Sequence, residues 1–229
     1  MAEGTRMVAV VGRLGVYPMI RLSLPARRIL AYLAIRGQPI ERSLAAAELW
    51  PDVPDDLARA NLRRTLWQTP DGWIGAVGEE IVLDAQTDLV EARRLAGNAL
   101  DGAPLTLPQI ALLSSDILPG WHDEWVIGDQ DAFRLLRVQA LEAACRSMAL
   151  NGAHALATQA GAAALNAEPL RESAAEALID AHLAQRNRYE AAQCFRSLAE
   201  RLRDELGVGP DPRLTERLVA IGLADLLAK

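Results

Sequence analysis

The first part of the chain changes from short runs of alternating hydrophobic and polar positions to apolar positions at helical spacing. Three runs, Val8–Val11, Gly15–Tyr17 and Ile20–Leu24, predict strands. Pro25 ends the third run, and beyond it apolar residues recur every three or four positions up to Gly37. Proline often begins a helix and glycine often ends one, so these two residues bound a predicted first helix.

Two more helices and a hairpin are predicted next. Residues 41–50 form a short amphipathic run, and residues 55–68 form a longer one that ends before Pro70. The predicted buried stripe of the longer run consists of Ala58, Leu62 and Leu66. Beyond it, the apolar residues on both sides of 75–80 predict a hairpin. Three short helices followed by a hairpin are typical of a winged helix-turn-helix domain.

Strand signals vanish after about residue 88, so we divide the chain into residues 1–87 and residues 88–229. In the second part, an offset of 35 residues superposes one predicted helical hairpin on the next. The aligned pairs are Gly152 and Asn187, His154 and Tyr189, Ala157 and Ala192, Ala160 and Phe195, and Ala164 and Ala199. Such repeats, with small residues where helices approach closely, are typical of tetratricopeptide-like arrays. Residues 88–118 would form a degenerate first pair.

The predicted fold class is mainly α with a small β component. It has an N-terminal winged helix-turn-helix domain followed by an all-α tetratricopeptide-like helical domain. The 229 residues are 51% hydrophobic and 24% charged, as in folded globular proteins. No apolar stretch reaches the ~20 residues that a membrane span needs. The N-terminal segment carries an acid where a signal peptide is basic, so we expect a cytoplasmic protein with no membrane partner.

The net charge of −6 is unevenly distributed. Residues 1–95 are balanced, with twelve arginines against twelve acids, and within them residues 21–70 carry eight arginines against five acids. A locally basic segment in an acidic chain favours a DNA-binding module fused to a partner-binding module. Cys145 and Cys194 stand far apart without a nearby histidine pair, which predicts buried thiols and neither a disulfide nor a metal site.

Four segments carry motifs that a generic amphipathic helix does not need. The first is LPARRILAYLAIRGQPIERSLAAAELWPDVPDDLARANLRRTLW at 24–67. The others are DILPGWHDEWV at 116–126, AEPLRESAAEALIDAHLAQRN at 167–187 and RDELGVGPDP at 203–212. The first segment resembles the DNA-binding domain of the Streptomyces antibiotic regulatory protein family. The other three resemble the bacterial transcriptional activation domain that follows it in that family.

The resemblance implies a small transcription activator. Such a protein binds direct repeats in double-stranded promoter DNA as a homodimer and recruits RNA polymerase holoenzyme, typically for a specialised-metabolite (antibiotic) gene cluster. No cofactor or metal is implied, and the sequence contains no GxxxxGK[ST] phosphate loop like that of the ATPase module in longer members.

The resemblance also implies that the helix at 55–68 enters the major groove, where Arg pairs with guanine and Asn or Gln with adenine. The candidates for base contacts are Asn61, Arg63, Arg64 and Gln68. The candidates for phosphate contacts are Arg59, Arg27 and Arg28. For each arginine, a solvated helix face stays the alternative. Trp67 is expected to pack against the hairpin, with base or partner contact as the alternative.

The chain departs from the family at two places. Relatives continue the third helix with Leu-Arg-Arg, whereas here Gln68-Thr69-Pro70 follows Trp67. The hairpin tip Gly78-Glu79-Glu80 places two acids where winged domains often put a basic residue into the minor groove. Both departures predict weak DNA binding by a monomer, strengthened by dimerisation or by polymerase.

Two other classes of function stay open. A protein-interaction adaptor would keep the fold but bind DNA weakly or not at all, and Trp121 and Trp125 would be its partner-binding anchor. Against that role, we favour both tryptophans closing the core between helix pairs. An enzyme is less favoured, because His122, His154 and His182 lie far apart without a nucleophile motif or metal spacing. We therefore predict no catalytic residue.

Overall fold

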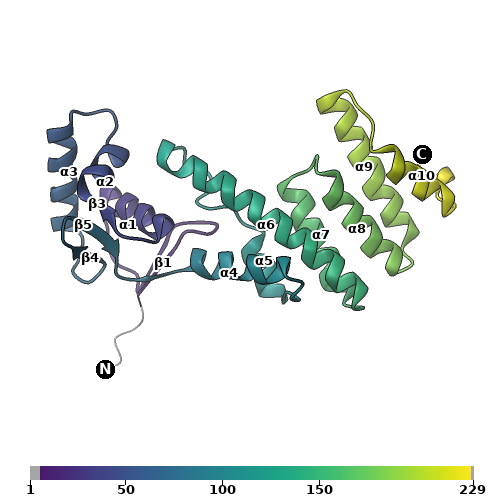
Figure 1. Ribbon diagram of the computed structural model, residues 1–229, viewed down its shortest axis with the longest axis horizontal. Coiled ribbons are helices and arrows are strands. Elements are labelled where there is room, and N and C mark those ends of the chain that lie inside the picture. The colour runs from purple at the N-terminus through teal and green to yellow at the C-terminus, as the bar shows by residue number, and fades with distance from the viewer. Residues whose placement is uncertain (1–5, 228–229) are drawn as a thin grey trace. The chain divides into compact units, whose positions relative to one another are not determined.

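The computed structural model describes residues 6–227, and the chain packs as two compact units (Figure 1). The first unit contains residues 6–93 together with Ser115–Phe133, and the second contains Arg94–Ser114 together with residues 134–227. The predicted division between residues 87 and 88 stays a prediction. No helix in the described part of the chain is both long enough and apolar enough to cross a membrane.

A small sheet opens the first unit. Its strands are β1 (Met7–Ala9), β2 (Gly15–Tyr17) and β6 (Gln86–Thr87), in the order β2-β1-β6. The expected third strand at 20–24 is wrong, because residues 18–23 lie outside regular structure and Leu24 already belongs to a helix. The Ser23 side chain accepts a hydrogen bond from the amide of Ala26 at 3.3 Å, which caps that helix and ends the extended segment.

Three helices follow β2 in the chain before the wing, as predicted. They are α1 (Leu24–Arg36), α2 (Arg42–Leu49) and α3 (Asp55–Gln68). Gly37 ends α1 in the left-handed conformation, with φ 65°, and its amide donates to the carbonyl of Leu33 at 3.0 Å. The short strand β3 (Ile40–Glu41) lies between α1 and α2 and pairs with the hairpin that comes after α3.

The predicted hairpin forms the wing. Strands β4 (Ile74–Val77) and β5 (Glu80–Leu83) pair antiparallel, with Val77 opposite Glu80, so the turn between them consists of Gly78 and Glu79. Gly78 has φ 59°, a conformation that glycine adopts without strain. The helix-turn-helix is thus followed by a tight wing with Glu79 at its tip.

Residues 115–133 complete the core of the first unit. The amide of Gly12 donates to the carbonyl of Asp116 at 2.7 Å, and the amide of Leu118 donates to the carbonyl of Val10 at 2.9 Å. These bonds lay the segment beside β1. Trp125 follows in the first turn of α6 and is 6% exposed. It therefore packs in a core, as we favoured, but against α1 of the first unit and not between helix pairs.

In residues 88–227 the regular elements after β6 are helices, apart from an isolated β-bridge between Val11 and Ile117. They are α4 (Asp88–Leu100), α5 (Leu107–Leu113), α6 (Glu124–Leu150), α7 (His154–Ala167), α8 (Glu172–Ala184), α9 (Arg188–Leu206), α10 (Pro212–Ala220) and α11 (Ala224–Leu227). The predicted repeat is confirmed, since α7 begins at His154 and α9 at Arg188, within one residue of the predicted offset of 35, and each starts a helical pair. Figure 1 shows α7, α8 and α9 side by side. Gly207 ends α9 in the left-handed conformation, with φ 71°.

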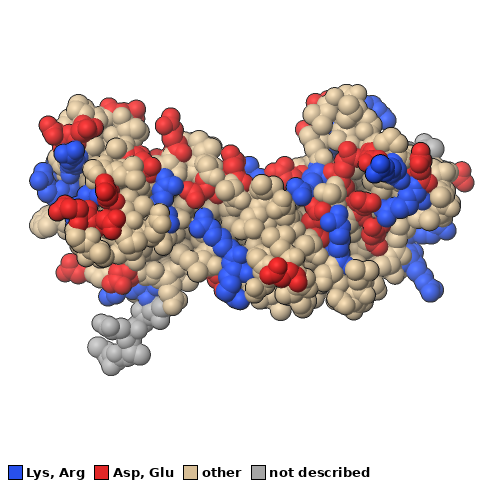
Figure 2. All heavy atoms as spheres, in the orientation of Figure 1, with Lys and Arg blue, Asp and Glu red and all other residues tan. Residues whose placement is uncertain are grey.

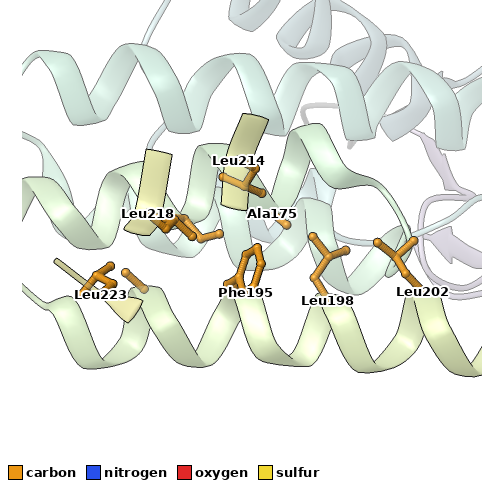
Figure 3. Packing of buried hydrophobic residues seen from close by; sticks show 9 residues of the cluster. Ala175, Phe195, Leu198, Leu202, Leu214, Leu218 and Leu223 are labelled. Atoms are coloured by element: carbon orange, nitrogen blue, oxygen red, sulfur yellow. The ribbon is translucent and has the colours of Figure 1, made fainter. Parts of the chain in front are cut away.

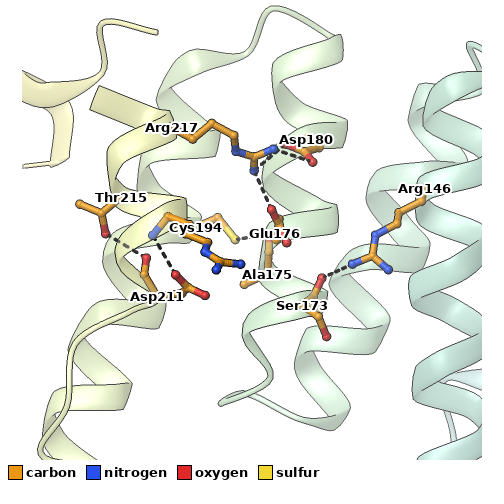
Figure 4. Close-up of polar contacts among 10 residues, drawn as sticks. Arg146, Ser173, Ala175, Glu176, Asp180, Cys194, Asp211, Thr215 and Arg217 are labelled. Atoms are coloured by element: carbon orange, nitrogen blue, oxygen red, sulfur yellow. Dashed lines mark hydrogen bonds and ion pairs between the residues drawn. The ribbon is translucent and has the colours of Figure 1, made fainter. Parts of the chain in front are cut away.

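The core of the last repeat joins α8, α9 and α10 (Figure 3). Its fully or nearly buried side chains are Ala175, Ile179, Ala191, Phe195, Leu198, Leu202, Leu214, Leu218 and Leu223. Around this core, Arg217 of α10 forms ion pairs with Glu176 and Asp180 of α8 (Figure 4). Both cysteines are free thiols, but only Cys145 is buried, whereas Cys194 is half-buried.

Candidate nucleic-acid interface

Helix α3 is the element that a winged helix-turn-helix presents to DNA. It begins at Asp55, and the negative charges of Asp55 and Asp56 in its first turn stabilise the helix by interacting with the positive end of its dipole. The helix buries Ala58 and Leu62 as predicted, but Thr65 is buried in place of Leu66, which is half-buried. The hydroxyl of Thr65 donates to the carbonyl of Asn61 at 2.8 Å, so this polar side chain is satisfied inside the unit.

The opposite face of α3 is basic and exposed. Arg59, Arg63, Arg64 and Gln68 are exposed, and Asn61 is half-buried at the edge of the face. Within residues 6–227, the three guanidinium groups of this face have no ion-pair or hydrogen-bond partner. Over α3 and the hairpin, Figure 2 shows basic side chains beside acidic ones. The basic face of α3 is therefore exposed and, within residues 6–227, unpaired, but acidic side chains lie beside it; DNA recognition by this face stays a prediction.

A groove of about 530 Å³ runs between α3, the start of α2 and the wing tip. Its lining residues are Glu41, Arg42, Ser43, Arg59, Leu62, Arg63, Leu66 and Glu79. The amide of Arg42 donates to the carbonyl of Glu79 at 3.1 Å, which holds the wing tip against α2. Arg42 is not among the predicted contact residues, because only the pairing of the wing with the start of α2 brings it beside Arg59.

Trp67 does not pack against the hairpin, so that expectation is wrong. Its side chain is 86% exposed. On a helix of 100° per residue it lies on the same face as Arg63 and Arg64, away from the side on which Leu62 and Thr65 are buried. A large aromatic side chain thus stands in the middle of the basic face.

The two arginines of α1 have different surroundings. Arg28 donates to the carbonyl of Leu49 at 3.0 Å and forms an ion pair with Asp123. Its side chain is 32% exposed and its guanidinium already has two partners within the unit, so its contact with phosphate stays a prediction. Arg27 is exposed and lies beside the turn between β1 and β2.

Other candidate residues do not converge on a second chemistry. Trp121 precedes α6 and is half-buried, and its ring lies edge-on to that of Trp125 at 6.2 Å. Its role as a partner contact stays a prediction. Among residues 6–227, no three His, Cys, Asp or Glu side chains come together in a group that could hold a metal ion.

The model of the bacterial transcriptional activator domain family matches residues 85–221. The chain belongs to this family. Membership in the bacterial transcriptional activator domain family makes the chain a transcription activator of the Streptomyces antibiotic regulatory protein type, as its motifs predict. This family is one of transcription regulators and not an enzyme class.

A solved structure supports the fold. The structure of Mycobacterium tuberculosis EmbR in complex with a low-affinity phosphopeptide superposes with a TM-score of 0.66, at 21% sequence identity. The match covers 97% of this chain and 68% of that chain. The likeness confirms the predicted fold class. A comparison with the curated proteins gives no match.

Proposed function

We propose that this chain is a cytoplasmic activator that binds double-stranded promoter DNA and recruits RNA polymerase holoenzyme to a specialised-metabolite gene cluster. The observation that carries the proposal is the basic face of α3, where Arg59, Arg63 and Arg64 are exposed and have no partner within the described residues. Exposed guanidinium groups without a partner can form two parallel hydrogen bonds with phosphate oxygens or with guanine.

The positions of the side chains suggest a division of roles. We assign base contacts to Arg63, Arg64 and Gln68, which occupy the last two turns of α3, with Asn61 at the edge of the face. Arg59 and Arg42 line the groove beside the wing, so we assign them to phosphates. Phosphate contacts fix the position of the helix on DNA, and base contacts select the sequence.

The acids beside this face argue for binding as a homodimer on direct repeats. Glu41 and Glu79 line the same groove as Arg59 and repel the DNA backbone. The attraction of one protomer to DNA is therefore small. Two associated protomers on adjacent repeats would bind DNA more tightly than one, because once the first protomer is bound the second contact becomes effectively intramolecular.

The first experiment is fluorescence anisotropy with labelled DNA from upstream of the chain's own gene and of neighbouring gene clusters. Scrambled DNA of equal length and a salt series accompany it. We expect one fragment to bind more tightly than scrambled DNA. The Arg63→Ala/Arg64→Ala variant is expected to abolish this preference, because both arginines are assigned to base contacts and each such contact is worth about 1–3 kcal/mol of discrimination between bases.

Arg201→Ala is the matched control, because Arg201 is an exposed arginine of α9 in the other unit. It should bind DNA as the unchanged protein does. Run-off transcription with RNA polymerase holoenzyme on the preferred fragment then tests recruitment, and more transcript is expected when the protein is added. Failure of every fragment to bind at low salt, with helicity intact by circular dichroism, contradicts DNA binding by the protein alone.

An adaptor function is the second candidate, and Trp67 favours it. An indole that is 86% exposed is unusual on a free surface and is frequent in protein interfaces. The acids at the wing tip and in the first turn of α3 point the same way. An adaptor would form a complex with another regulator or with polymerase while binding no DNA fragment, and Trp67→Ala would weaken that complex.

A further inference from the structure

A second groove lies in the first unit, at the turn between β1 and β2. It measures about 840 Å³. It is lined by Gly12, Arg13, Leu14, Gly15, Val16, Tyr17, Met19, Ile20, Arg21, Leu22, Arg27, Leu118, Pro119 and Trp121. Three parts of the chain therefore converge there: the β1–β2 turn with the segment after it, the start of α1, and the loop before α6.

All the charged residues that line this groove are arginines. Arg13, Arg21 and Arg27 are all exposed, and within the described residues none of them has an ion-pair or hydrogen-bond partner. No acidic residue belongs to its lining. The groove beside α3 differs, since Glu41 and Glu79 offset its arginines. Three uncompensated guanidinium groups around one hollow favour an anion with several oxygen acceptors.

Two aromatic rings add a flat apolar surface. Tyr17 folds over Gly15 so closely that a Cβ atom at position 15 would lie 2.8 Å from its ring. Trp121 is held by its backbone: its amide donates to the carbonyl of Leu118 at 3.0 Å, and its carbonyl accepts from the Nε2 of Gln130 at 3.3 Å. The ring of Tyr17 therefore lies against its own strand, and the backbone of Trp121 is held at both its amide and its carbonyl.

The groove does not belong to the recognition face. In Figure 1, α1 lies between α3 and the purple turn that joins β1 to β2. In this view, α1 thus separates DNA lying along the exposed face of α3 from the β1–β2 turn, which carries Arg13. The DNA backbone is therefore not the natural partner of Arg13.

We propose that this groove binds a small phosphorylated ligand that carries an aromatic ring, the chemical class of the nucleotides. The guanidinium groups would hold the phosphate oxygens, and Tyr17 or Trp121 would contact the ring. The volume is within the ~300–1,000 Å³ that pockets for small ligands occupy. An acidic peptide would satisfy the arginines but leaves the two rings without a specific partner.

The test is isothermal titration calorimetry of the full chain with ATP as the probe, and with adenosine and inorganic pyrophosphate as separate arms. We expect ATP to bind more tightly than either arm, because only ATP engages both the arginines and the rings. Arg13→Ala and Arg21→Ala should each weaken ATP binding about tenfold, because each removes a charge-assisted bidentate hydrogen bond. The ATP affinity of Arg21→Lys should lie between those of the unchanged protein and Arg21→Ala. Lysine keeps the positive charge but does not have the planar guanidinium group that donates two parallel hydrogen bonds.

Arg201→Ala is the control for unspecific attraction of ATP to arginine, and it should bind ATP as the unchanged protein does. Equal weakening in Arg201→Ala and Arg21→Ala, or no ATP binding at all, overturns the proposal. Binding of a polyglutamate peptide in place of ATP also overturns it and makes the groove a docking site for an acidic protein segment. The DNA titration tests Arg63 and Arg64, which do not line this groove. A failure of ATP binding therefore does not contradict the proposed DNA binding, and a failure of DNA binding does not contradict the proposed ligand site.

Discussion

The indole of Trp125 meets the phenol ring of Tyr32 edge to face, with ring centroids 5.3 Å apart and planes at 81°. Tyr32 is completely buried in α1, and Arg36 of the same helix lies over its ring at 5.1 Å. Burial raises the pKa of Tyr32 to about 12. This pair attaches the start of α6 to the helix-turn-helix, so the first unit depends on a contact between residues far apart in the sequence.

Trp125→Ala is expected to destabilise the first unit by about 3–5 kcal/mol, the usual cost of removing a large buried aromatic side chain. Chemical denaturation followed by circular dichroism measures this change. Trp67→Ala is the matched control, since that indole is 86% exposed and its removal should change the free energy of unfolding by less than about 0.5 kcal/mol. Equal effects of the two substitutions would contradict the packing described.

Gly161 allows α7 to approach its neighbours closely. A Cβ atom there would lie 2.9 Å from the Sγ of Cys145 in α6 and 3.1 Å from the Cβ of Leu178 in α8. We therefore expect Gly161→Ala to destabilise the protein by about 1–3 kcal/mol through overpacking. Thermal unfolding and denaturant titration both report this destabilisation.

The control for Gly161 is Gly97→Ala in α4. A Cβ atom at position 97 meets no atom within 4 Å, so alanine should be neutral or stabilise the helix by up to about 1 kcal/mol. The double variant Gly161→Ala/Cys145→Ala should recover part of the stability, because it removes the Sγ atom that the new methyl group meets. No recovery would place the strain at Leu178 alone.

Glu142 is a nearly buried carboxylate of α6 with three partners. It accepts from Arg171 at 2.8 Å and from Ser173 at 3.0 Å, and it pairs with Arg146 at 2.6 Å. Burial alone would raise the pKa of Glu142, but these partners outweigh it, and the pKa is lowered. Because the folded pKa lies below the unfolded value of about 4.3, the ionised carboxylate stabilises the folded state above that value. The stabilisation disappears as the pH falls through the folded pKa.

Glu142→Gln should therefore lower the free energy of unfolding by about 1–3 kcal/mol at pH 7, because it leaves buried donors imperfectly matched. The difference from the unchanged protein should narrow as the pH falls below about 4. Denaturant titrations at several pH values measure this. The exposed pair of Glu176 and Arg217 is the control, and Glu176→Gln should cost less than about 1 kcal/mol. A difference that does not change with pH would show that Glu142 acts only by its shape.

Local signals made the helix bounds of the first unit predictable. Gly37 and Pro70 mark helix ends by their own backbone chemistry, so α1 and α3 end where the sequence indicates. The repeat was predictable from aligned pairs such as Gly152 and Asn187, because the same packing of a helical pair recurs along the chain and places similar demands on equivalent positions. Periodicity failed at residues 20–24, where the cap of Ser23 on α1 competes with strand formation.

Contacts between distant parts of the chain were not predictable. The ion pair of Arg28 with Asp123 joins residues 95 positions apart, and no local pattern announces it. Arg42 reaches the groove beside α3 only because the wing tip bonds to its amide. The exposed face of α3 was therefore predictable, because one helix determines it, whereas its surroundings were not, because the fold determines them; contact of this face with DNA stays a prediction.

Trp67 is the residue whose substitution separates the two proposed functions. If α3 enters the major groove, its exposed indole meets base edges and thymine methyl groups beside Arg63 and Arg64. Trp67→Ala should then weaken binding to the preferred fragment by about three- to tenfold, with little change in the salt slope, because no charge is removed. Anisotropy titrations at two salt concentrations measure both quantities.

Leu150→Ala is the control for removal of an exposed apolar side chain, since Leu150 of α6 is 88% exposed and belongs to neither groove. It should leave DNA affinity unchanged. If Trp67→Ala also leaves DNA affinity unchanged but weakens a complex with another regulator or polymerase, the indole belongs to a protein interface.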